Sequence, residues 1–206
     1  GTARGRVAAT TLQDAHLDVR LGGAQLQATG SLGRAGDRME VNVDGPDLDR
    51  LRVLLAEWVP AALPVISGRL RGKATLVGPR DDLALTFDAR GENLKQDGGG
   101  VGMLDVRGNI GAPSQGRSLA IGASATKLTT PVGRYASATG SLRGTLAAHA
   151  LTLAIVGDDV DANLRFEGGL ADGRWRGTLA GLRNRGSFQA ELAAPAVQIG
   201  QVAANI

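Results

Sequence analysis

The sequence predicts a mostly β protein, an elongated antiparallel sheet with one short amphipathic helix near residues 46–60. Apolar and polar residues alternate with a period of two through most of the chain, and short clusters rich in Gly, Pro and Asp separate the alternating segments. Only one segment has apolar residues at helical spacing. Strands that are apolar on one face and polar on the other are typical of antiparallel sheets.

The alternating segments define the expected strands. Aliphatic residues stand at every second position, with Arg, Thr, Ser, Gln or Asp between them. These segments are 24–32, 39–43, 66–76, 83–89, 119–125, 142–146, 151–155 and 160–166. Gly, Pro and Asp predict turns at 78–82, 111–116 and 157–159. A change of frame near Met103 and Leu104 predicts a β-bulge.

One segment, residues 46–64, departs from the alternation. Pro46 and Asp47 suit the start of a helix, and Pro60 suits its end. Apolar residues recur at helical spacing at positions 48, 51, 54, 55 and 58. We expect about three turns of amphipathic helix. It covers an open end or edge of the sheet, or alternatively lies on a membrane surface.

A loose internal repeat runs along the chain. The pattern Gly-x-(Leu, Ile or Trp) begins at Gly30, Gly68, Gly108, Gly140 and Gly173, at intervals of 38, 40, 32 and 33 residues. Such periods mark repeated supersecondary units, here of two or three strands, which stack to bury their apolar faces. We therefore expect residues 1–206 to be a single elongated β-rich segment of a longer polypeptide, built of loose repeats of 32–40 residues.

Composition narrows the possible functions. The formal net charge is +3, and the Arg residues are scattered over the strands without a basic stripe or stacking aromatics, so no nucleic-acid partner is expected. The absence of Cys excludes disulfides and Cys-ligated zinc. No run of 18 apolar residues occurs, so no bilayer-spanning helix is expected.

Catalytic and metal-binding patterns are missing from the sequence. His16 and His149 are isolated, without a nucleophile or paired carboxylates in a known pattern. Asp159, Asp161 and Asn163 have the spacing of a calcium loop, but its sixth position is Leu164 and its twelfth is Leu, not Gly and Glu. We therefore expect no enzyme activity, no metal and no cofactor, and a hairpin turn at the Asp cluster.

The apolar face of the strands is the remaining candidate for function. Aqueous proteins rarely expose such a face without a ligand or partner. Aliphatic walls suit an acyl chain, since hydrocarbon needs no hydrogen-bond partner and gains about 0.8 kcal/mol per buried CH₂. A closed sandwich would show the same alternation and hide the face. Inner glycines such as Gly72, Gly144 and Gly177 are expected to keep an open groove wide. The positions expected to line it are Leu70, Leu76, Leu85, Phe87, Leu142, Leu146, Leu153, Leu164, Phe166 and Trp175.

A family resemblance rests on two stretches. In the last third, a Trp-x-Gly-x-Leu-x-x-Leu run is followed by a Gly, an amphipathic strand and a Leu-x-x-Pro-Ala step. These residues are Trp175, Gly177, Leu179, Leu182, Gly186, Leu192, Pro195 and Ala196. In residues 46–85, a short helix leads through a Pro step into "SGRLRG" strands. On these motifs the chain resembles the TamB family, the translocation and assembly module proteins, over about residues 24–200.

The resemblance implies a periplasmic protein with a curved, U-shaped β-groove that carries phospholipid acyl chains between the inner and outer membranes. The family's N-terminal membrane anchor and the C-terminal region that engages the outer-membrane partner TamA are absent, so an internal fragment is expected. The full-length protein would be anchored in the inner membrane. A scaffold or chaperone for outer-membrane proteins and autotransporters, working with TamA, is the alternative function, and an inert spacer with a sealed apolar face is a third.

Overall fold

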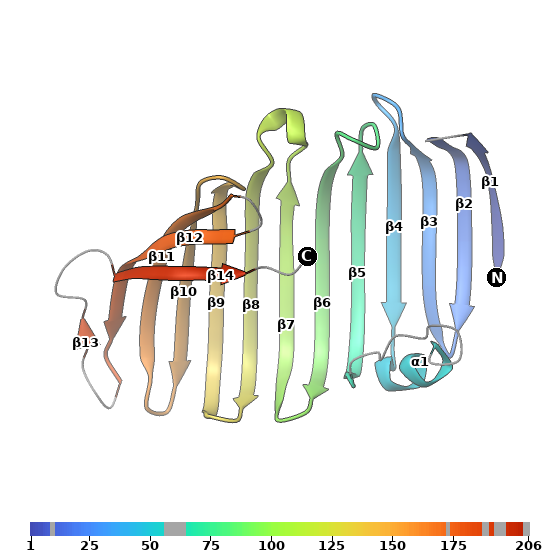
Figure 1. Cartoon of the computed structure of the whole chain (residues 1–206). Coiled ribbons are helices and arrows are strands. Elements are labelled where there is room, and N and C mark those ends of the chain that lie inside the picture. Colours follow the sequence, from blue (N-terminus) through green and yellow to red (C-terminus); the bar gives the residue numbers. More distant parts are fainter. Residues whose placement is uncertain (9–10, 56–64, 172–173, 187–189, 192–196, 204–206) are drawn as a thin grey trace.

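The chain forms one antiparallel sheet of 14 strands (Figure 1). The computed structural model describes residues 1–8, 11–55, 65–171, 174–186, 190–191 and 197–203. From β1 to β13 each strand pairs with the next along the chain, and β14 pairs with β12. This topology of successive hairpins confirms the prediction of a mostly β, elongated antiparallel sheet.

The strands fall on the alternating segments, with the predicted turns between them. Their bounds are β1 Thr2–Ala8, β2 Thr11–Leu21, β3 Ala24–Leu32, β4 Arg38–Gly45, β5 Ser67–Val77, β6 Ala84–Gln96, β7 Gly99–Ile110, β8 Ser118–Thr130, β9 Gly133–Thr145, β10 His149–Gly157, β11 Asp161–Ala171, β12 Arg174–Asn184, β13 Ala190–Glu191 and β14 Val197–Ala203. A short 3-10 turn, Pro113–Gln115, connects β7 to β8.

The helix α1 spans Leu48–Leu55, between β4 and β5. The side chain of Asp47 caps it, since its Oδ1 accepts a hydrogen bond from the Arg50 amide at 3.0 Å. The predicted start of the helix is therefore confirmed. Its predicted end at Pro60 lies outside the described residues.

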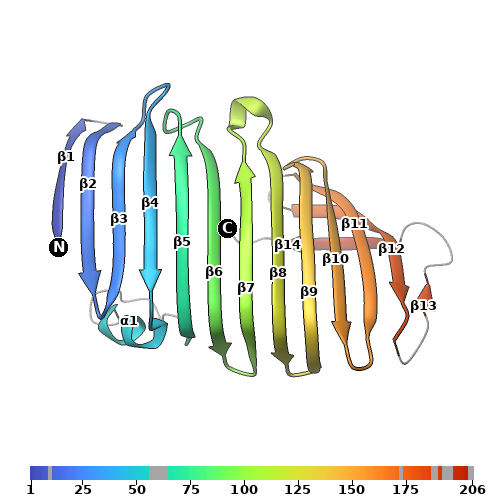
Figure 2. The same ribbon diagram turned by 180° about the vertical axis from the view of Figure 1, so that it is seen from behind.

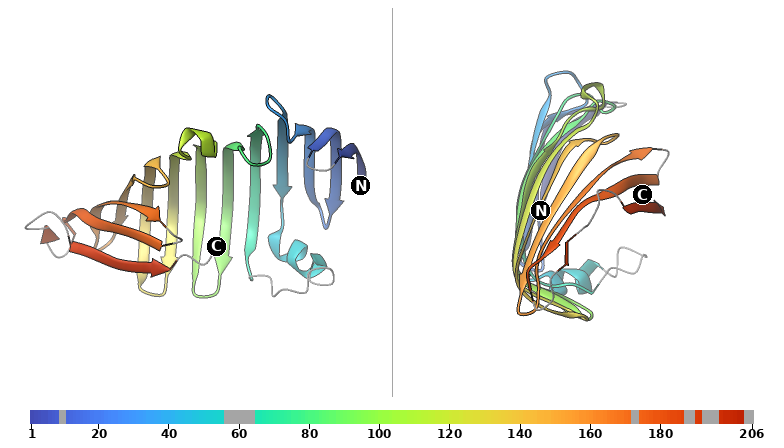
Figure 3. Two further views of the ribbon diagram at one scale, coloured as in Figure 1. Left: turned by 45° about the horizontal axis from the view of Figure 1, so that its top comes forward. Right: turned by 90° about the vertical axis from the view of Figure 1, so that its left-hand side faces the viewer.

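The sheet is bowed, with a concave and a convex face. Figure 3 shows the strands arching, with α1 and the last strands on the concave side. Figure 1 looks onto this concave face, where β12 and β14 cross in front of β9 and β10, and Figure 2 looks onto the convex face. A Cβ built on Gly45 would lie 3.2 Å from Leu48 Cδ2, so α1 packs on the concave face beside β4.

One row of residues is left out of the ladder across β5–β9. From β6 to β9, the facing strands pair on both sides of this row but not at the row itself. At the same level, the register shifts between β5 and β6 and between β9 and β10. Three residues of this row have left-handed φ angles of 113°, 51° and 53°. These three are Gly68, Asn93 and Lys127, in that order, and the other two are Gly102 and Ala136. We call these five residues the interrupted row.

The predicted β-bulge at Met103 and Leu104 is wrong. Both residues pair in regular register, with Glu92 and Gly91 of β6. The change of frame that suggested a bulge begins at the neighbouring Gly102, in the interrupted row. Because the facing strands skip one residue each, no strand gains an extra residue there.

The loops at the upper end of the sheet in Figure 1 are bonded to one another. Hydrogen bonds join the pairs Gln13–Asp37, Asp37–Gly78, Asp82–Ser114, Arg117–Leu146 and Leu146–Leu170. They connect β2 through successive loops to the end of β11. At the lower end the turns at 22–23, 97–98 and 131–132 are tight, and no hydrogen bond between these three turns occurs in the described residues.

The repeat glycines lie on alternate strands. Gly30 lies in β3, Gly68 in β5, Gly108 in β7 and Gly140 in β9, while Gly173 lies outside the described residues. Each interval between them therefore spans two strands. The assignment of the chain to one segment of stacked repeats stays a prediction.

Two glycines of the "GSLRG" copy in β9 have different roles. Gly144 has a φ of 129°, and a Cβ there would lie 2.8 Å from His149 Cα and against the Ala148 carbonyl oxygen. A Cβ on Gly140 would make only an ordinary contact, 3.6 Å from the Thr152 carbonyl oxygen. Gly144 is therefore required by the backbone at the turn into β10, a stricter reason than the width of the groove.

We expect Gly144→Ala to lower the free energy of unfolding by about 1–3 kcal/mol, because L-residues are strained at this φ. Gly140→Ala is the control in the same strand. It is expected to be neutral, or to stabilise by about 0.4–1 kcal/mol by restricting the unfolded chain. Urea denaturation measures both. Equal losses in the two variants would contradict the assignment.

Asp82 gives a second prediction, on pH. Hydrogen bonds from Ser114 Oγ at 2.6 Å and from the Ser114 amide at 2.7 Å hold the pKa of the Asp82 carboxyl below its usual range. The folded pKa is thus below the unfolded value of about 3.9, so this stabilisation is present above the unfolded pKa and is lost as pH falls through the folded pKa. Asp82→Asn should flatten the acid limb of a stability–pH profile. Asp81→Asn, which leaves these bonds intact, should not.

Candidate functional site

Cross-strand register places nearly all apolar strand residues on the concave face. Directly paired residues share a face, and neighbours along a strand alternate. One row across this face reads Leu17, Ala28, Val41, Ala74, Phe87, Gly108, Ile121, Leu142, Leu151, Phe166 and Leu179. An adjacent row on the convex face reads Asp18, Gln27, Asn42, Lys73, Asp88, Arg107, Gly122, Ser141, Thr152 and Arg165. The sheet therefore separates a continuous apolar face from a polar one.

Nine of the ten positions predicted to line a groove lie on the concave face. Eight of them are half-buried there: Leu70, Leu76, Leu85, Phe87, Leu142, Leu153, Leu164 and Phe166. Trp175 occupies a position of the same face, paired with Leu170. Leu146 lies outside the strands, in the turn after β9, where its backbone bonds to Arg117 and Leu170.

These residues form two groups with a gap between them. Leu76 pairs with Leu85 on β5 and β6, and Leu153 pairs with Leu164 on β10 and β11. The strands β7 and β8 bridge the groups with apolar residues that the sequence-based list left out. These are Leu104, Val106, Ile110, Leu119 and Ile121. The alternation in residues 119–125 is the signal from which the β8 residues could have been added to the predicted lining of the groove.

Apart from α1 beside β4 and the strands β12 and β14 in front of β9 and β10, the concave face has no second layer in the part of the chain that the structure describes. The buried apolar residues of the described chain are Ala15, Ala24, Met39, Leu119, Ala125 and Ala162 in the strands and Ala112 in the loop after β7, and no large side chain is fully buried. Leu151, in the middle of the face, is 38% exposed. A closed sandwich would bury such residues. The described strands therefore form an open face instead of the sealed interior that an inert spacer would need.

Small residues form a furrow across the middle of the concave face. Gly72, Ala89, Val106, Ala123 and Gly140 pair in sequence from β5 to β9, and we call these five residues the furrow. Four strand spacings of about 4.8 Å make it about 19 Å long. At its β8–β9 end lies a hollow of about 280 Å³, whose lining includes the furrow's Ala123 and Gly140 and also Ile121, Leu142, Leu151 and Leu153.

Among the regularly paired positions of the concave face in β2–β12, two carry polar side chains, His149 and Asn184. His149 Nδ1 lies 3.1 Å from the Thr145 carbonyl oxygen, across the β9–β10 turn. Asn184 is buried, and its Oδ1 accepts a hydrogen bond from the Asp161 amide at 3.1 Å. Both lie toward the ends of their strands and bond to the backbone there, which leaves the centre of the face to hydrocarbon contacts.

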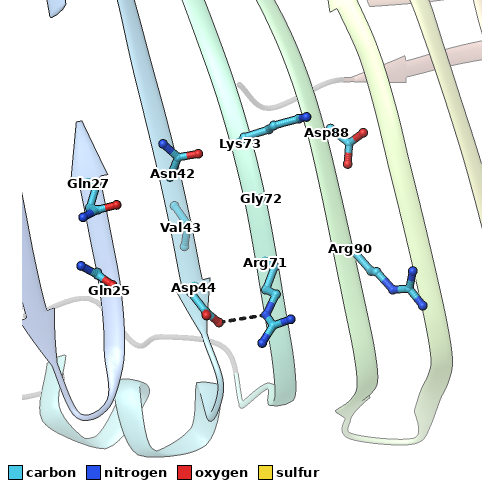
Figure 4. Close-up of a pocket in the computed structure, with 10 residues that line it drawn as sticks. All are labelled: Gln25, Gln27, Asn42, Val43, Asp44, Arg71, Gly72, Lys73, Asp88 and Arg90. Carbon is cyan, nitrogen blue, oxygen red and sulfur yellow. Dashed lines mark hydrogen bonds and ion pairs between the residues drawn. The ribbon is translucent and has the colours of Figure 1, made fainter. Parts of the chain in front are cut away.

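The convex face carries mixed charges and amides. Figure 4 shows these side chains on β3–β6, where they line a shallow depression of about 320 Å³. Arg71 Nε lies 3.3 Å from Asp44 Oδ1, both exposed, an ion pair worth at most about 1 kcal/mol. Amide hydrogen bonds from Gln25 and Gln27 lower the pKa of the Asp18 carboxyl. These contacts are those of a hydrated sheet surface.

No group of three or more His, Asp or Glu residues suited to hold a metal ion occurs in residues 1–8, 11–55, 65–171, 174–186, 190–191 and 197–203. Within those same ranges, no helix has the length and apolar character needed to cross a bilayer.

Comparison with known proteins identifies the family. No curated protein and no solved structure matches the chain. The family model described as "TamB, N-terminal domain" matches residues 4–192, which confirms the family that the sequence motifs indicated. This chain, with its open sheet and apolar concave face, belongs to the TamB family.

Proposed function

We propose that this chain is a lipid-transport segment whose concave face carries phospholipid acyl chains across the periplasm, between the inner and outer membranes. In this role it supports outer-membrane biogenesis and has no catalytic task. The single observation that supports the proposal most is the register. It keeps one face apolar from β2 to β12 and leaves that face uncovered in the described residues, apart from α1 and the crossing strands β12 and β14.

The energetics favour an acyl chain as the occupant. Each CH₂ that leaves water for the concave face contributes about 0.8 kcal/mol, and hydrocarbon leaves no hydrogen bond unsatisfied. A protein strand on the same face would bring backbone N–H and C=O groups that the apolar side chains could not satisfy. An open sheet also lets the polar headgroup stay in water at the rim while the chain is covered.

The furrow suggests the direction in which the acyl chain lies. It crosses the strands and so follows the long axis of the sheet. Its length of about 19 Å is comparable to half of the roughly 30 Å hydrocarbon core of a bilayer, the depth that one acyl chain fills. Because neighbouring rows of the face have the same aliphatic chemistry, an acyl chain can shift along the sheet without breaking polar contacts.

A second candidate function is a scaffold for outer-membrane proteins and autotransporters, working with a TamA-type partner that other parts of the full-length protein would engage. The observation that favours it is the edge of the sheet: β1 pairs with β2 alone, so its outer backbone groups are open to strand addition in the described structure. Crosslinks from β1 to substrate peptides, in the absence of bound lipid, would support the scaffold over the conduit.

Leu153→Asp tests the conduit on the concave face. The carboxylate would lie against the hydrocarbon of a bound lipid, so we expect loss of most bound phospholipid in native mass spectrometry, with an effect of at least about tenfold in affinity. Thr152→Asp places the same charge one residue away on the exposed convex face and should bind lipid as the parent does. Equal lipid binding by the two variants would contradict the proposed face.

Ala123→Leu tests the furrow without adding charge. The larger side chain fills the floor between Val106 and Gly140, so we expect fewer lipids bound per chain while the face stays apolar. Ser124→Leu adds a leucine to the same strand on the convex face and is the control. Quantitative lipid extraction measures both. An unchanged lipid count in Ala123→Leu would argue against the furrow as the acyl-chain path.

A further inference from the structure

We propose that the lower ends of β5–β8, with the start of β9, form a hinged flap through which lipid reaches the concave face. The flap comprises residues 65–67, 94–101 and 128–135. This inference rests on the proposed function, since it names the point where the acyl chain of a phospholipid is loaded.

The hinge is the interrupted row. Between their ends, the strands β6, β7 and β8 are paired at all positions except the one that holds Asn93, Gly102 and Lys127. A sheet resists bending through its cross-strand hydrogen bonds, so the line with missing rungs is where bending breaks the fewest. Left-handed φ angles at Asn93 and Lys127 show that the backbone already departs from the strand conformation there.

The two ends of the sheet are held differently, which makes the lower end the movable one. At the upper end, loops are bonded to each other across the sheet, as in the Asp82–Ser114 pair. The flap turns at 97–98 and 131–132 have no hydrogen bond to each other in the described residues. The flap can therefore swing against a fixed upper rim.

The flap has its own apolar hollow of about 360 Å³. Among its lining residues are Ile66, Leu94, Val101, Leu128 and Pro131. Its volume is in the range of small-molecule sites. At the tip of the flap Val132 is 85% exposed, an apolar side chain next to the hollow and open to solvent.

Continuity with the concave face identifies an acyl chain as the occupant. Leu94 reaches across the interrupted row, since a Cβ built on Gly91 of the concave face would touch its Cδ1. The side chain of Leu94 thus joins the hollow to the apolar face by a hydrocarbon contact. Lys95, which also lines the hollow, offers an ammonium group to the phosphate of the headgroup.

Spin labels test the movement, and the chain has no native Cys to interfere. In the full chain, one label pair is Gln115→Cys with Val132→Cys, from the upper rim to the flap tip. The control is Gln115→Cys with Ser124→Cys, which lies on β8 above the interrupted row. Adding vesicles of phosphatidylethanolamine and phosphatidylglycerol should shift the first distance distribution and leave the second unchanged. Two narrow, unshifted distributions would overturn the flap.

Loading kinetics test the hollow. Leu94→Asp should slow lipid uptake from these vesicles about tenfold, because a carboxylate meets the passing hydrocarbon. Leu153→Asp should instead reduce the amount bound. If the parent takes up no phospholipid, the proposed function and the flap both fail. If Leu94→Asp loads as fast as the parent and the labels do not move, the flap alone fails.

Discussion

The whole structure depends on the cross-strand register, which keeps the alternation of successive strands in phase. A slip of one residue would turn every side chain of that strand to the opposite face. From β2 to β12 no such slip accumulates, although the register shifts locally in the pairs β2–β3, β5–β6, β9–β10 and β11–β12. The result is one face of Leu, Val, Ile, Ala and Gly and another of Arg, Asp, Gln, Thr and Ser.

A register of this kind yields an unusual balance of forces. The described strands bury few side chains completely, so the sheet is held by its ladder, its turns and the bonded upper loops more than by a packed core. Its apolar face remains a large surface in contact with solvent unless something covers it. The interrupted row lies beside the hollow near Leu94, so the proposed hinge and an apolar surface coincide there.

The sequence predicted the features that follow from the alternation of apolar and polar residues, and it missed the features that depend on the conformation of single residues. Alternation gave the strands and placed residues such as Leu76 and Phe87 on one face, and Asp47 marked the start of α1. The interrupted row depends on the left-handed conformation of Asn93 and Lys127, which has no periodic signal, so the frame change was misassigned to a bulge at Met103. Leu146 keeps the period of β9 but lies in the turn after it.

The most direct test of the central claim is nuclear magnetic resonance on methyl-labelled protein with bound phospholipid. Leu85, Ile121 and Leu153 have their methyl groups on the concave face, whereas Val77 and Val156 have theirs on the convex face of the same sheet. The account predicts intermolecular nuclear Overhauser effects from acyl-chain protons to the three concave residues and none to the two valines. Effects of equal strength on both faces, or on Val77 and Val156 alone, would contradict it.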